Sequence, residues 1–180
     1  IIEKARTLGI ADLNEATAQV SKKYFELYKK DLKRMGMQDP DFEPKATEFI
    51  PQMVDLIKKL IPKHAYELGD DIYFEICSFP DYGKLSKQNL VELLENGRYE
   101  DAEVSNKKFA LDFALWKSVK ADEPSWEGPI AGKRGRPGWH IECSAMSLAY
   151  FKGDFDIHVV GRDLILPHHE NENAQSCCVT

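Results

Sequence analysis

The chain has 180 residues, of which 43% are hydrophobic and 11% aromatic, so it carries enough apolar material for a folded core and is not disordered. Its formal net charge of −6 argues against a general nucleic-acid coat, its apolar stretches are too short to cross a bilayer, and "IIEKARTLGI" lacks the features of a secretory signal. We therefore expect a cytoplasmic or organellar protein with no membrane contact, whose four cysteines, lacking any CxxC pair, stay reduced.

The first part of the chain has patterns typical of two helices and a hairpin. Apolar residues recur every three or four positions over residues 11–37, which predicts an amphipathic helix. A second helix is predicted over 48–64, with Thr47 as its cap and Pro51 in its first turn. Residues 65–79 alternate aromatic or β-branched side chains around a "GDD" turn, which predicts a short hairpin.

The middle of the chain has fewer regular patterns. Residues 84–97, "KLSKQNLVELLENG", predict a short capped helix that ends at its glycine. From there to residue 137 the spacing loses any steady period and Gly and Pro accumulate, which predicts mostly loop with one strand near 112–117.

The last part of the chain alternates between strand and helix patterns. Residues 138–151 predict a short buried strand leading into a helix, 155–161 predict a second strand, and 167–176 predict a helix that begins at a proline. This order is typical of an α/β fold with a parallel, doubly wound sheet, in which ligands bind at the carboxyl ends of the strands. Those ends indicate a site near Cys143, Asp163 and His168.

The proline-initiated helix suggests a metal site. If it begins at Pro167, His168 and Glu172 are four residues apart on one face, whereas His169 points about 100° away. A thiolate from Cys143 would complete a sulfur, nitrogen and oxygen set that suits zinc better than magnesium or calcium. A lone cysteine is more often a core residue, and a polar helix start is more often a solvated cap. Spacing alone therefore leaves both interpretations open.

The other histidines and cysteines carry weaker signals. The adjacent Cys177 and Cys178 are more often inert than metal-binding in such a position. His140 and His158 are either groups of a binding pocket or core histidines with satisfied hydrogen bonds, and their spacing does not decide between the two.

Long motifs resemble one enzyme family. The run "RPGWHIECSAMS", followed by "FDIH" and "DLILPHHENENAQS", is similar to cysteinyl-tRNA synthetase, a class I aminoacyl-tRNA synthetase. Upstream, "DDIYFEICSFPDYGKLS" and "DFALWKSVKADEPSWEGP" resemble the connective region inserted in the same family. The resemblance covers most of the chain. It implies a Rossmann-like catalytic domain that joins cysteine to its tRNA with ATP and magnesium.

The resemblance also implies a zinc ion that binds the thiolate of the substrate cysteine. Cys143, His168 and Glu172 match three of the family's four protein ligands. The fourth is a cysteine near the family's amino terminus, which precedes the first residue of this chain, so its zinc site is expected to be incomplete. No catalytic side chain is implied, because the substrate carboxylate itself attacks the α-phosphate of ATP.

Further positions match substrate-binding residues of the family. Trp139 corresponds to the tryptophan that closes over the cysteine side chain, with core packing as an equal alternative. We count His140 and His158 as candidate substrate-binding groups. Asp163 lies where the family places an acidic residue near the adenosine ribose, and Gly161 is the second candidate for nucleotide binding.

The sequence also departs from the family pattern. Val159 and Val160 stand where family members usually carry glycines, and their branched side chains are expected to crowd ATP or reshape the turn. The His-Ile-Gly-His and Lys-Met-Ser-Lys-Ser signatures are absent, so we do not expect this chain alone to activate cysteine.

We therefore interpret the chain as an internal or shortened part of such a synthetase. Residues 1–45 would end the first half of the nucleotide-binding fold, 46–137 would form the connective insertion, and 138–180 would open the second half with the zinc site. Two alternatives remain: a related ligase that joins cysteine to an amino sugar, and a non-catalytic module that binds zinc or a protein partner. The sequence gives no indication of oligomeric state.

Overall fold

The computed structural model describes residues 1–89, 106–120 and 123–179. Helices and a sheet are both present, so the mixed helix-and-sheet class expected from the sequence is confirmed. The helix predicted over 84–97 falls mostly on residues 90–105, outside the described residues. Within the described residues, no helix is both long and apolar enough to cross a membrane.

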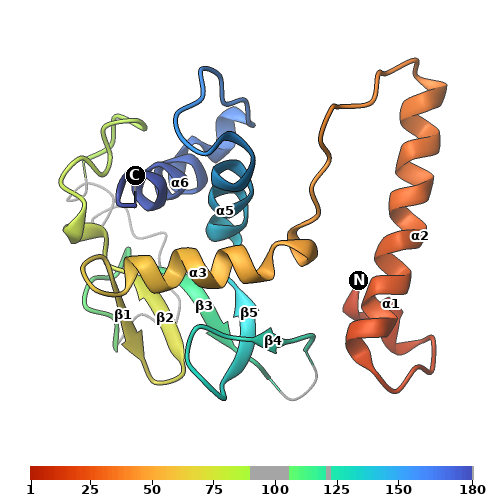
Figure 1. Cartoon of the computed structure of the whole chain (residues 1–180), viewed down its shortest axis with the longest axis horizontal. Helices are drawn as coiled ribbons and strands as arrows, with labels where there is room; N and C mark the ends of the chain where they lie inside the picture. The colour runs from red at the N-terminus through yellow and green to blue at the C-terminus, as the bar shows by residue number, and fades with distance from the viewer. Residues whose placement is uncertain (90–105, 121–122, 180) are drawn as a thin grey trace.

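Two antiparallel helices at the start of the chain stand to one side of the main body (Figure 1). Helix α1 spans Ile2–Arg6, and α2 spans Leu13–Arg34, which confirms the predicted amphipathic helix. The Asp12 carboxylate caps α2 by accepting a hydrogen bond of 2.9 Å from the backbone N–H of Asn14. The two helices enclose a small core of their own, formed by Ala5, Ala16 and Val20.

Helix α3, Ile50–Leu60, is the central apolar helix of the body. Pro51 occupies its first turn as predicted, where a missing N–H has no cost. The predicted cap at Thr47 is wrong, because Thr47 lies in the short turn η1 (Ala46–Glu48) and the helix starts at Phe49 without a side-chain cap. The core face of α3 is formed by Ile50, Met53, Leu56, Ile57 and Leu60, all of which are buried.

The sheet has five strands in the order β1-β2-β3-β5-β4, and every described pair is antiparallel. The predicted hairpin is confirmed, with Gly69 in the turn at a φ of +64°, a conformation that glycine adopts without strain. The strand expected near 112–117 is confirmed as β3. The sequence did not predict β4 or β5. The strands are β1 (Ala65–Leu68), β2 (Asp71–Phe74), β3 (Phe113–Ser118), β4 (Trp126–Glu127) and β5 (Arg134–Pro137).

The last part of the chain differs from the predicted strand and helix order. Residues Trp139–Phe151 form a single helix, α5, which begins directly after β5, so the expected strand before it is absent. Residues 155–161 form no strand either: Ile157 is 79% exposed and Val159 is 84% exposed. No described strand pairs with this segment, so its apolar alternation finds no sheet to join. The parallel sheet inferred from these elements is therefore not present among the described residues.

The chain ends in a helix close to the predicted position. Leu166 is extended (φ −127°, ψ 130°), and the helical backbone starts after it, within the short segment η5 (Ile165–His169). Helix α6, Glu170–Cys177, continues it and packs against α5. Figure 1 shows α5 and α6 above the end of the sheet, with α3 crossing in front of the strands. One hydrophobic core joins all three helices to the sheet. The predicted domain boundaries stay predictions.

Candidate metal and substrate site

Three of the predicted ligands lie together. Cys143, His168 and Glu172 each offer one ligand atom, and these atoms lie within 4.8 Å of one another. It is the one such group of three or more His, Cys, Asp or Glu side chains found in the described part of the chain. Cys143 comes from within α5 rather than from the strand end that the sequence suggested. Two packed helices therefore supply the cluster.

The spacing argument for the histidine and the carboxylate is confirmed. His168 Nε2 faces Glu172 Oε1 across one helical turn, and both side chains are more than nine-tenths buried. Glu172 Oε2 lies 2.7 Å from Nε2 of His158, and Oε1 is buried against Nε2 of His168. Because a buried carboxylate needs donors or a cation to compensate its desolvation, this group of atoms fits a cation.

The thiol supplies the third donor. Burial raises the pKa of Cys143 to about 12, and the negative charge of Glu172 acts in the same direction. The thiol therefore stays protonated at neutral pH unless a cation stabilises its thiolate. Sulfur, imidazole nitrogen and a carboxylate oxygen form a donor set typical of zinc and unlike those of magnesium or calcium. The three residues thus fit a zinc ion.

Aromatic rings surround the ligand histidine. The Trp139 ring stacks on His168, with 4.3 Å between ring centroids and 26° between the planes, while the Trp139 side chain remains 52% exposed. Nδ1 of His140 lies 2.9 Å from Nδ1 of His168. Burial lowers the pKa of His140 to about 4, and the charge of His168 adds to this effect, so His140 is neutral at pH 7. The first two residues of α5 thus both contact the ligand ring.

A cavity of about 400 Å³ adjoins the cluster, a size within the range of small-molecule sites. Glu172 forms part of its wall, so a bound molecule would lie directly beside the cluster. His158, one of the expected substrate-binding groups, also lines it, together with Ser144, Phe155, His169 and Asn173. Trp139 and His140 do not line this cavity, and their predicted contacts with substrate stay predictions.

The two expected nucleotide-binding residues lie outside the cluster. Gly161 and Asp163 are exposed, at the start of the turn η4 (Arg162–Leu164). A Cβ placed on Gly161 would come within 2.6 Å of Asp163 Oδ1, so only glycine lets the backbone approach that carboxylate without rearrangement. The Val159 side chain projects into solvent. A role of these residues in ATP binding remains a prediction.

Sequence reasoning missed a second set of polar residues on α6. The Glu170 carboxylate is fully buried and accepts hydrogen bonds from the backbone N–H groups of Gly83 (2.8 Å) and Ser86 (2.7 Å). The neighbouring Asn171 accepts one from the Tyr82 hydroxyl. These bonds fasten the 82–86 loop to the helix that carries Glu172. The available signal was the dense polar run "HHENEN", which we interpreted only as a source of metal ligands.

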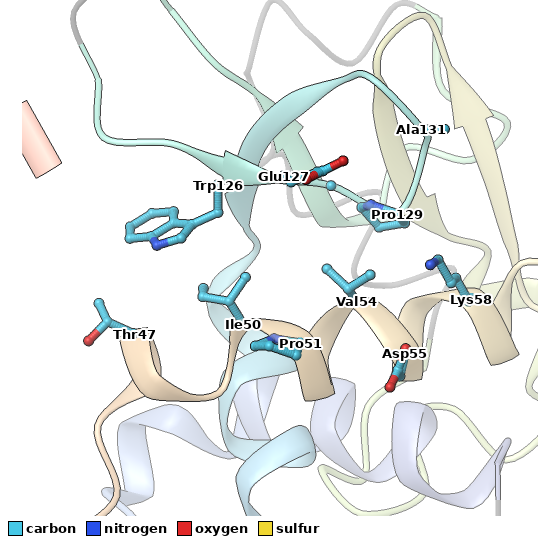
Figure 2. Close-up of a pocket in the computed structure, with 11 residues that line it drawn as sticks. Thr47, Ile50, Pro51, Val54, Asp55, Lys58, Trp126, Glu127, Pro129 and Ala131 are labelled. Carbon is cyan, nitrogen blue, oxygen red and sulfur yellow. The ribbon is translucent and has the colours of Figure 1, made fainter.

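The largest of the described cavities, about 570 Å³, lies elsewhere, between α3 and the segment that contains β4. Figure 2 shows the Trp126 ring near Thr47 and Ile50, with Lys58 and Pro129 toward the other end. Apolar side chains dominate its walls, and none of the clustered ligands reaches it. We therefore place the chemistry at the smaller cavity, beside Glu172.

The sequence is similar to that of known proteins over most of its length. Residues 1–180 match a family model described as tRNA synthetases class I (C) catalytic domain. The chain is 49% identical over 177 residues to a cysteine–tRNA ligase of Carboxydothermus hydrogenoformans, covering 98% of this chain and 36% of that protein. It is 48% identical over 181 residues to the Thermodesulfovibrio yellowstonii ligase, covering 98% and 35%. The chloroplastic/mitochondrial ligase of Arabidopsis thaliana is 47% identical over 167 residues, covering 92% and 29%. The chain thus spans about a third of the length of these curated relatives.

Proposed function

Because this chain belongs to the catalytic-domain family of class I tRNA synthetases (C), we propose that it contributes the amino-acid pocket of a cysteine–tRNA ligase. In this proposal Cys143, His168 and Glu172 hold a zinc ion. The substrates are cysteine, ATP with magnesium, and the tRNA for cysteine. The observation that carries the proposal is the convergence of a sulfur, a nitrogen and an oxygen ligand within 4.8 Å beside a cavity of small-molecule size.

The substrate itself explains why a metal is needed. Cysteine and serine differ by one atom, and pocket shape alone separates such neighbours by a factor of only about 10 to 200. Bound zinc would stabilise the substrate thiolate, whereas a serine hydroxyl would stay protonated and bind weakly. In this proposal the chain would hold three of the ligands beside the cavity, where a substrate thiol could reach the metal.

The remaining residues would position substrate rather than react with it. His158 faces the cavity, and Trp139 exposes half of its ring next to His168, so both can contact the amino acid. Gly161 and Asp163 would contact ATP. Since the cysteine carboxylate attacks the α-phosphate, catalysis requires placement and charge neutralisation and no side-chain nucleophile.

Metal binding and thiol selectivity test the proposal on the chain itself. We expect the purified chain to bind one zinc ion and Cys143→Ala to lose it, while Cys77→Ala, a matched change at an exposed cysteine outside the cluster and its cavity, retains it. With cobalt as a coloured substitute, added cysteine should produce a thiolate-to-metal absorption band and serine should not. Equal zinc loss in the two variants, or equal responses to the two amino acids, would contradict the proposal.

The acceptor substrate distinguishes the proposed ligase from its amino-sugar relative. The sequence similarity to proteins named cysteine–tRNA ligase supports tRNA as the acceptor. An assay that offers the tRNA and an amino sugar in competition for activated cysteine should yield cysteinyl-tRNA. The proposed location follows the site of protein synthesis, which is the cytoplasm or an organelle such as that named for the Arabidopsis relative.

A further inference from the structure

We propose that His140 is a positioning residue that fixes the metal-ligating ring of His168 by accepting a hydrogen bond from it. This inference rests on the proposed metal site and assigns a role to a residue that supplies none of its three ligands. The sequence suggested that His140 binds substrate directly. We infer instead that it acts by orienting the ring of His168.

The geometry begins with the two facing nitrogens. Nδ1 of His140 and Nδ1 of His168 are 2.9 Å apart, a normal hydrogen-bond distance that requires one proton between them. On the other side of the His168 ring, Nε2 faces Glu172 and the metal position. A neutral histidine that ligates through Nε2 carries its proton on Nδ1. With metal bound, His168 must therefore donate and His140 must accept.

Within residues 1–89, 106–120 and 123–179, no other acceptor for His168 Nδ1 is recorded. Among the described residues, His140 is the one recorded hydrogen-bond partner of His168 Nδ1, and His168 is only 3% exposed, so water cannot readily replace it. A ligating histidine normally has such a partner, which selects the tautomer and the ring orientation. Without the His140 acceptor, the buried N–H would lack a partner.

Packing holds the acceptor ring in its place. The Phe113 ring of β3 meets the His140 ring edge-on, with 5.5 Å between centroids and 80° between planes. Trp139 stacks against His168 from the adjacent position of α5. His140 and Cys143 lie three residues apart on the same helix, so the start of α5 contributes both a direct ligand and the partner of a second ligand.

The test compares His140→Leu with His140→Asn. Leucine fills similar space without an acceptor, whereas the asparagine Oδ1 lies roughly where the histidine Nδ1 was and can accept the bond. We expect His140→Leu to weaken zinc binding by about 10- to 100-fold, measured by competition with a chromophoric chelator. His140→Asn should restore most of the affinity. Thermal unfolding of the metal-free variants controls for a general loss of stability.

Nitrogen-15 spectra of the zinc-loaded chain examine the proton directly. We expect His168 to be protonated at Nδ1 and His140 to be protonated at Nε2 and unprotonated at Nδ1. A proton on His140 Nδ1, or wild-type zinc affinity in His140→Leu, would overturn this inference while leaving the metal site intact. Absence of zinc binding by the wild-type chain would overturn the metal site itself and this inference with it.

Discussion

Helices α2 and α6 are both rich in polar residues but differ in how deeply they are buried. Helix α2 leaves Tyr24, Leu27 and Tyr28 between 43% and 52% exposed. Helix α6, built mostly from Glu, Asn, Gln and Ser, buries polar side chains almost completely, among them Glu170 and Asn171. The two helices are similarly polar on average, so mean hydropathy alone would not have separated their environments. The comparison shows that burial in this chain follows the partners that a side chain meets.

The partners differ in kind between the two helices. A buried carboxylate is tolerated only where donors or a cation compensate its desolvation. Glu170 has two backbone N–H donors, and Glu172 has His158 together with the facing His168. Helix α2 packs mainly against the short α1, exchanges two hydrogen bonds with Ser125 through Asn14, and has Ala16 and Val20 as its buried residues. Its remaining apolar side chains have little described surface to cover them.

The strongest test of this contrast is the removal of the Glu170 carboxylate. Glu170→Ala leaves the N–H groups of Gly83 and Ser86 without their acceptor, so we expect the free energy of unfolding to fall by about 3 kcal/mol in urea denaturation. The matched change Glu26→Ala, at an exposed position of α2, should alter it by less than about 0.5 kcal/mol. Similar losses in both variants would remove the distinction between the helices.

Metal addition tests whether a cation also compensates the second buried carboxylate of α6, that of Glu172. Zinc supplied at about 100 times its dissociation constant should raise the free energy of unfolding by about 2.7 kcal/mol, because it binds the folded chain and not the unfolded one. Cys143→Ala should abolish this gain, and a chelator should reverse it in the wild type. Stabilisation that persists in Cys143→Ala would place the zinc elsewhere.

Local signals in the sequence predicted the parts of the fold that depend on neighbouring residues. The β1–β2 hairpin follows from alternation around a glycine turn, and α3 follows from helical spacing with Pro51 at its start. Strand β4 was missed because it is only two residues long, and β5 because its four residues include a glycine and a proline. Both depend on pairing with a neighbouring strand for their conformation. The 155–161 segment has a strand pattern but no described partner strand, so pattern alone was misleading there.

The same distinction applies to the site. His168 and Glu172 were predictable because four-residue spacing on a helix fixes their common face. Glu170 was not, because its two donors are backbone groups 87 and 84 residues away and leave no trace in side-chain spacing. Cys143 was placed in the cluster from its residue type and order in the chain, although the element that carries it is a helix and not the predicted strand.

The smallest expected effect concerns the exposed apolar face of α2. Leu27 is 44% exposed and lies outside both hydrophobic cores, so Leu27→Gln should change the free energy of unfolding by less than about 0.5 kcal/mol. Leucine and glutamine also have similar helix propensities, so the substitution should not weaken the helix itself. The measurement should be made at several protein concentrations. If a second copy of the chain covered this face, the substitution would lower the free energy of unfolding more at higher concentrations, where more of the protein is associated. A decrease in the free energy of unfolding above about 1 kcal/mol that grows with protein concentration would show that α2 buries its apolar face against a partner. The contrast between α2 and α6 would then apply only to the single chain.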